Sequence, residues 1–412
     1  LEEDSDFMMQ LQSLITMIGG IGVFLLGMMI MTDGLKALAG ARISQWLADR
    51  TTSPLSGAMT GAIGTAMLQS SSATTVAAVG FVGAGLMTFT ASLGIIFGAN
   101  IGTTITGWMV ALLGFKLKLT LIMLPMILFG VILRLFARGK WATSGYTLAG
   151  FGLIFVGIGL MQEGMSGMQG LLTPETLPED TWLGRIQIML LGAVATLVTQ
   201  SSSASIAATL TALHANAISF EQALALVVGM DIGTTVTAVL ATIGGTANAR
   251  RTGISHMIYN LMTGFGALLL ITPYLMALHY FLPNMVQDNA EISLVAFHTL
   301  FNLLGVILVL PFTMRFANLV RRLVPDRDYP LAKELNDDLL ETPPLALTTV
   351  QQMVLQEYSQ LLNHIDAIVH PERPAKRTDL VRMQLVLDET HAYLDAIQVK
   401  EGDAASRDRL LD

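Results

Sequence analysis

The chain carries one motif twice, as Gln69-Ser70-Ser71-Ser72-Ala73 and as Gln200-Ser201-Ser202-Ser203-Ala204, and these two copies decide the fold. Each copy is followed by a second motif, which reads Gly98-Ala99-Asn100-Ile101-Gly102-Thr103-Thr104 in the first case and Gly229-Met230-Asp231-Ile232-Gly233-Thr234-Thr235 in the second. The offset from Gln69 to Gln200 equals that from Asn100 to Asp231, namely 131 residues. Upstream, Gly22, Gly27 and Gly34 match Gly152, Gly157 and Gly164 at an offset of 130. Because this register holds over so long a stretch, we infer an internal duplication.

The composition around these motifs is typical of a membrane protein. Apolar residues make up 52% of the 412 residues and charged residues only 13%, which is about half the share found in soluble domains. No Asp, Glu, Lys or Arg occurs between Arg50 and Lys116, and one spanning helix needs about 20 residues. We therefore expect an all-α integral membrane protein that crosses the inner (plasma) membrane several times within the lipid bilayer. The net charge of −8 resides after Val324, and such an acidic tail gives no argument for a nucleic-acid partner.

Polar side chains at the centre of two apolar segments predict re-entrant helical hairpins. In residues 53–87, the stretch from Gln69 to Thr75 holds six hydrogen-bonding side chains. A helix facing lipid would not carry that many at mid-depth. Two half-length helices that meet at Gln69–Ser72 and are buried in protein fit this pattern better. Residues 183–214 repeat the pattern and predict the second hairpin.

A different kind of interruption, the broken membrane helix, is expected in residues 89–113 and 223–243. Both segments are long enough to cross, but glycines and a threonine cluster surround Asn100 in one and Asp231 in the other. Glycine costs about 1 kcal/mol in a helix interior. We therefore predict breaks near Asn100 and Asp231.

The number of crossings determines how the two repeats are oriented. Three full crossings separate the first helix of repeat 1 (residues 1–145) from that of repeat 2 (residues 146–324, including a final span), so the repeats have inverted topology. With the N-terminus outside, the predicted cytoplasmic segments hold twelve Lys and Arg and the external ones three, as the positive-inside rule requires. Residues 325–412 are predicted to form a short acidic cytoplasmic tail containing two amphipathic helices.

Each hairpin centre offers hydrogen-bond donors that suit an anion. A helix that begins near Ser71 or Ser202 exposes N–H groups that have no partner within the helix and lie at the positive end of its dipole. Serine hydroxyls add short, rotatable donors. Two such tips facing each other would enclose a small tetrahedral anion at mid-membrane, where secondary transporters built from inverted repeats place their sites.

The breaks near Asn100 and Asp231 offer oxygen atoms instead, and these suit a hard cation. No Lys or Arg lies in the uncharged membrane core, so we expect bound cations to balance the charge of the anion. Cation-coupled anion symport is therefore favoured. The residues leave open whether the cation is sodium or a proton on Asp231, and whether the chain forms a homodimer.

The duplicated pair of motifs, Gln-Ser-Ser-Ser followed by Gly-x-Asn/Asp-Ile-Gly-Thr-Thr, resembles the type II sodium/phosphate cotransporter family over about residues 14–320. The resemblance implies sodium-coupled uptake of inorganic phosphate into the cell by elevator-like alternating access. It implies phosphate at the hairpin serines, which are Ser70, Ser71, Ser72, Ser201, Ser202 and Ser203. It implies co-transported sodium ions near Gln69, Thr103, Thr106, Gln200, Thr234 and Thr237, to which the reasoning above adds Asn100 and Asp231. The tail resembles the start of the PhoU-like helical extension of some bacterial members.

Other functions are compatible with parts of this pattern. A symporter of another small oxyanion, or an anion channel, would use the same hairpin tips. An intramembrane hydrolase would need a base and an orienting group beside its serine, and no Gly-x-Ser-x-Gly motif occurs, so we do not expect an enzyme. His256 and His298 lie four residues before Asn260 and Asn302, so each pair shares a helix face. We expect interhelical hydrogen bonds there rather than a metal site.

Overall fold

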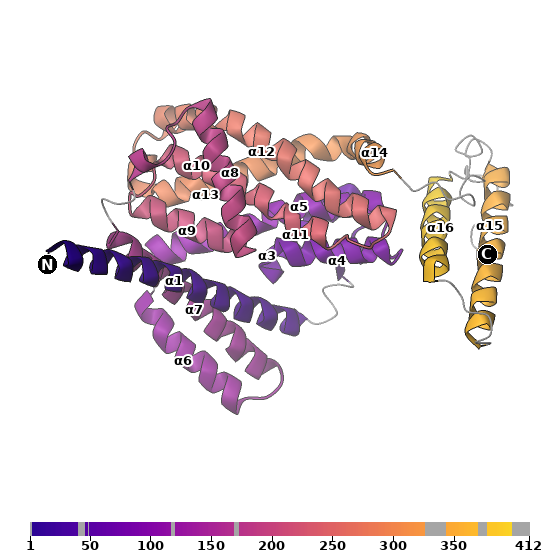
Figure 1. The fold of residues 1–412 in the computed structure, drawn as a ribbon, viewed down its shortest axis with the longest axis horizontal. Helices are drawn as coiled ribbons and strands as arrows, with labels where there is room; N and C mark the ends of the chain where they lie inside the picture. The colour runs from indigo at the N-terminus through magenta and orange to yellow at the C-terminus, as the bar shows by residue number, and fades with distance from the viewer. Residues whose placement is uncertain are drawn as a thin grey trace.

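The structure, a computed structural model, describes residues 2–39, 46–47, 49–116, 120–168, 173–325, 343–369 and 377–397. All regular elements in these ranges are helices, which confirms the expected all-α class. Seven helical segments among them are long and apolar enough to cross a membrane. In Figure 1 the helices as far as α14 form one body, and α15 and α16 lie beyond it.

The principal helices are, in chain order, α1 (Glu2–Ala39), α3 (Pro54–Leu68), α4 (Ser71–Gly83), α5 (Phe89–Met109), α6 (Thr120–Phe136), α7 (Lys140–Ser166), α8 (Trp182–Thr199), α9 (Ser202–His214), α10 (Phe220–Gly233), α11 (Thr235–Leu240), α12 (Ala247–Phe281), α13 (Met285–Val309), α14 (Thr313–Leu323), α15 (Pro343–Val369) and α16 (Arg377–Ala396). A π-helical segment, Val110–Lys116, extends α5, and a 3-10 turn, Leu310–Phe312, joins α13 to α14.

The seven candidate spans are not the same seven that the sequence predicts. α8, expected as half of a hairpin, is long enough to qualify, whereas α6 is only a shorter apolar helix. Part of the expected length of α6, residues 117–119, lies outside the described residues. α7 begins at Lys140, six residues before residue 146, where the second repeat is predicted to begin.

The first helices of the two repeats, α1 and α7, pack against each other through glycines. Gly20 lies against Gly157, and Gly27 lies against Gly150. Because the residue numbers rise along one helix as they fall along the other, the two helices are antiparallel. At the offset of 130, Gly20 corresponds to Gly150 and Gly27 to Gly157, so each repeat presents the same pair of residues to the other. This reciprocal contact is what an inverted duplication predicts.

Within each repeat, a hairpin helix packs closely on the long helix that follows it. α3 contacts α5 where the Ala58 carbonyl oxygen lies at Gly98, and α8 contacts α10 where the Met189 carbonyl oxygen lies at Gly229. A Cβ atom at either glycine would collide with that oxygen. The helices approach so closely only because these positions carry no side chain. Both contacts join residues that correspond at the offset of 131, so the duplication extends to the packing.

The prediction of a helix broken near Asn100 is wrong. α5 runs without interruption from Phe89 to Met109. The glycines that suggested a break are instead the positions at which α5 meets α3, and close packing offsets the low helix propensity of glycine. In the second repeat the interruption exists but lies at Thr234, between α10 and α11, where the Thr234 hydroxyl donates a hydrogen bond to the Asp231 carbonyl oxygen over 2.7 Å.

The described part of the tail consists of α15 and α16, in agreement with the two amphipathic helices predicted there. They share a small apolar core formed by Ala346, Leu347, Val350, Tyr393 and Ile397. Residues 326–342, 370–376 and 398–412 of the predicted tail lie outside the described residues.

Candidate functional site

Both hairpin motifs interrupt their helices at the predicted glutamine. α3 ends at Leu68 and α8 at Thr199. The residues that follow, Gln69 and Gln200, cap these helices, and both adopt the left-handed conformation with φ of 52°. The next helix then begins with a serine cap, since the Ala73 N–H donates to the Ser70 hydroxyl, and the Ala204 N–H to the Ser201 hydroxyl, each over 3.2 Å. A left-handed conformation costs a residue other than glycine roughly 1–2 kcal/mol, so the glutamine side chain must contribute something that glycine could not.

The glutamine side chain links the hairpin to the following helix by hydrogen bonds. The Gln69 amide nitrogen donates to the Ala66 carbonyl oxygen over 2.6 Å, and its Oε1 accepts a hydrogen bond of 2.9 Å from the Thr106 hydroxyl. Gln200 repeats both contacts, with Leu197 over 2.6 Å and with Thr237 over 3.2 Å. The matched glutamines and threonines are therefore brought together as the duplication suggests.

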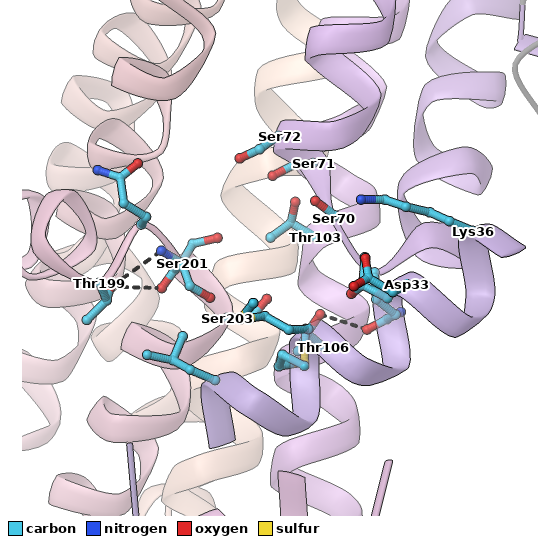
Figure 2. Close-up of a pocket in the computed structure, with 17 residues that line it drawn as sticks. Asp33, Lys36, Ser70, Ser71, Ser72, Thr103, Thr106, Thr199, Ser201 and Ser203 are labelled. Atoms are coloured by element: carbon cyan, nitrogen blue, oxygen red, sulfur yellow. Dashed lines mark hydrogen bonds between the residues drawn. The ribbon is translucent and has the colours of Figure 1, made fainter. Parts of the chain in front are cut away.

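The two tips meet at one cavity of about 360 Å³, which is room for several water-sized molecules. Figure 2 shows Ser70, Ser71 and Ser72 across this cavity from Ser201 and Ser203. The other lining residues that were predicted as ligands are Gln69, Thr103, Thr106, Gln200 and Ser202. The residues predicted to bind phosphate, together with four of the residues predicted to bind sodium, therefore line one cavity.

The serines at the cavity divide into two kinds. Ser70 and Ser201 are engaged as helix caps. Within the described residues, the hydroxyls of the next two serines in each copy form no hydrogen bond, and these are Ser71, Ser72, Ser202 and Ser203. Together with the first N–H groups of α4 and α9, they leave a set of donors directed at the space between the tips.

Four of the predicted sodium ligands do not line the cavity: Asn100, Thr234, Thr237 and Asp231. Thr237 is linked to the cavity only through Gln200, a lining residue to which its hydroxyl donates a hydrogen bond. The Thr234 hydroxyl, between α10 and α11, donates to the Asp231 carbonyl oxygen of α10. Because α5 is unbroken, no carbonyl group is released near Asn100, so one of the oxygen ligands expected for a cation there is missing.

Asn100 and Asp231 instead belong to a buried polar cluster with His256, Asn260, His298 and Asn302. Asn100 donates to the side-chain oxygen of Asn260, whose own amide nitrogen donates to the Asp231 carbonyl oxygen over 2.7 Å. The Asp231 carboxylate lies 3.1 Å from His298 Nε2 and accepts a 2.8 Å hydrogen bond from Asn302. The expectation that the two His-x-x-x-Asn pairs join helices by hydrogen bonds is thus confirmed.

The cavity also has a wall that the sequence reasoning missed. One stripe of α1 lines it, made of Leu25, Met28, Met29, Thr32, Asp33 and Lys36. Lys36 therefore lies at the cavity, although the sequence reasoning considered only the uncharged membrane core and found no Lys or Arg there. The available signal was periodicity, since these residues recur three and four positions apart on one helix face.

Comparison with known proteins identifies a family and several relatives to which the chain is similar. A family model described as Na+/Pi-cotransporter matches residues 23–163 and 175–286. The chain is 30% identical over 306 residues to the uncharacterized protein YqeW of Bacillus subtilis, covering 73% of this chain and 95% of that protein. It is 28% identical over 387 residues to YjbB of Escherichia coli K12, which is named as a candidate inorganic phosphate export protein. This match covers 90% of this chain and 68% of YjbB.

A shorter match of 102 residues is 34% identical to the human sodium-dependent phosphate transport protein 2B and covers 24% of this chain and 15% of that protein. No solved structure matches the chain significantly.

Proposed function

Because the chain belongs to the Na+/Pi-cotransporter family, we propose that it carries inorganic phosphate across the membrane in symport with sodium ions. The observation that supports this best is the convergence of all six hairpin serines on one cavity. One tip alone offers donors on one side only, whereas two tips related by the duplication surround a tetrahedral anion.

The phosphate oxygens accept hydrogen bonds from the serine hydroxyls that have no protein partner and from the first N–H groups of α4 and α9. Both helices direct the positive end of their dipole toward the cavity, which favours negative charge there. The capping serines, Ser70 and Ser201, hold these helix ends in place and act on phosphate mainly through that geometry.

Sodium binds beside the phosphate at the glutamine–threonine pairs. The Gln69 and Thr106 oxygens, with Thr103 nearby, supply the hard oxygen ligands that the ion requires. In this conformation Gln69 is 9% exposed, whereas Gln200 is exposed to solvent. We infer that the site of the first repeat is closed and that of the second is open, as alternating access requires of two equivalent halves.

The sodium gradient determines the direction of net transport, since a symporter runs either way. With sodium higher outside, the proposed protein takes phosphate up. The positive-inside count predicts that the C-terminal end of α1 and the tail lie in the cytoplasm. The name of YjbB points to export, which would require either a different coupling ion or transport down a phosphate gradient.

The test is uptake of labelled phosphate by proteoliposomes with an imposed inward sodium gradient. We expect accumulation that disappears when choline replaces sodium. Release from phosphate-loaded vesicles that needs no sodium would support export or an anion channel instead. Uptake that sulfate or a carboxylate suppresses as strongly as phosphate would identify a symporter for another oxyanion.

A further inference from the structure

The cavity between the hairpin tips contains one formal positive charge, and it comes from α1. Among the seventeen lining residues, all within the described part of the chain, only Asp33 and Lys36 carry charged side chains. Both are exposed to solvent rather than packed in the protein. Figure 2 shows Lys36 extending from α1 toward Ser70 of the first hairpin tip.

The rotation of α1 about its axis is fixed, so the position of Lys36 at the cavity follows from packing. Gly20, Gly27 and Gly34 recur every seven residues and face α7, where Gly34 lies against Thr147. A Cβ at any of the three would lie within 3.0 Å of an α7 atom. With that face held against α7, the stripe containing Asp33 and Lys36 is left on the cavity.

A full positive charge in this cavity would stabilise a bound anion more than the neutral donors alone. Hydroxyl and N–H dipoles provide partial charges only, and an anion that leaves water for a protein cavity loses its hydration. A lysine ammonium is a compact charge with three donors on a flexible stem, so it can follow the anion while the serines fix its position. Hydrogen bonds between charged partners are also the strongest ones.

The second repeat has no equivalent charge. At the offset of 130, Asp33 and Lys36 correspond to Glu163 and Ser166, and neither of these lines the cavity. The Ser166 hydroxyl donates to the Glu163 carbonyl oxygen over 2.8 Å. The cavity is therefore charged at one end only, near the point where α1 ends at Ala39.

We propose that Lys36 binds the transported phosphate directly and adds a positive charge beside it, while the carboxylate of Asp33 on the same helix opposes binding of the anion. This inference rests on the proposed function and adds a substrate ligand from outside both hairpins. It also predicts opposite effects of the two neighbours: Asp33→Asn lowers the phosphate KM, and loss of the Lys36 charge raises it.

The chain contains no cysteine, so Lys36→Cys introduces a single thiol that can be modified selectively. At saturating sodium we expect the phosphate KM of Lys36→Cys to rise about tenfold or more. Modification with aminoethyl methanethiosulfonate, which attaches an ammonium group, should recover most of the loss. The sulfonatoethyl reagent, which attaches a negative group, should raise KM further. Inorganic phosphate should slow the modification of Cys at this position.

Lys140→Cys is the matched control. Lys140 is exposed and begins α7, but it does not line the cavity. Its KM should not respond to the substitution or to either reagent. Equal responses in the two variants, an unchanged KM in Lys36→Cys, or a modification rate that phosphate does not affect would overturn the inference. A wild-type protein without sodium-dependent phosphate transport would refute the proposed function itself.

Discussion

Gly98→Ala tests the packing on which the site depends. A Cβ at Gly98 would lie 2.6 Å from the carbonyl carbon and 2.9 Å from the Cα of Ala58, whereas ordinary contact begins at 3.4 Å. The neighbouring atoms are backbone, so they cannot rotate away and α3 must move. Overpacking of this kind costs about 1–3 kcal/mol, and the better helix propensity of alanine returns about 1 kcal/mol. We expect a net destabilisation of up to about 2 kcal/mol.

The assay is the apparent melting temperature of the purified protein in detergent, with Gly80→Ala as the matched control. Gly80 lies inside α4, and a Cβ added there would have no neighbouring atom within 4 Å, so the same substitution should stabilise the protein or have no effect. Gly98→Ala should lower the melting temperature by a few degrees. It should also raise the sodium concentration needed for half-maximal transport, because moving α3 stretches the Gln69–Thr106 hydrogen bond.

A Gly98→Ala protein that is more stable than the wild type would refute this reasoning. That result would mean that α5 is not held against α3, and that the glycine weakens the helix as the sequence first suggested.

The other predictions concern the site and the tail. Ser71→Ala and Ser202→Ala should each weaken phosphate binding by about 1–3 kcal/mol, seen as a higher KM at saturating sodium; unchanged values in both would remove these serines from the site. Asp231→Asn should lower the melting temperature, because the new amide nitrogen faces donors on His298 or Asn302, while the phosphate KM stays the same; a large shift in sodium dependence at constant stability would restore Asp231 as a cation ligand. Deletion of all residues after position 326 should leave phosphate transport intact, and loss of uptake in a correctly inserted protein would contradict this.

Much of the membrane fold could be predicted because the motifs are local. The interruptions at Gln69 and Gln200 depend on residues next to one another, and the duplication marks both. Whether the helix breaks near Asn100 could not be predicted in the same way. A glycine that weakens a helix and a glycine that allows a neighbouring backbone to approach look alike in sequence. Only the position of Ala58 beside Gly98 distinguishes the two.

The charged wall of the cavity was missed for a related reason. Lys36 lies near the end of a spanning helix, where a basic residue commonly marks the cytoplasmic side. Its role at the cavity depends on how α1 is rotated, and that rotation is set by contacts with α7 more than a hundred residues away in sequence.

The reciprocal glycine contacts between α1 and α7 also suggest how such a chain arose. Partners that offer each other identical surfaces are the mark of a two-fold homodimer. A half-length ancestor inserted in both orientations could have assembled in this way, and fusion of two gene copies would then have fixed one antiparallel pair. Once joined, the halves were free to diverge. The two repeats of this chain differ at corresponding sequence positions: Asn100 corresponds to Asp231, and Lys36 corresponds to Ser166. Any difference between binding from the two sides of the membrane must originate in such substitutions.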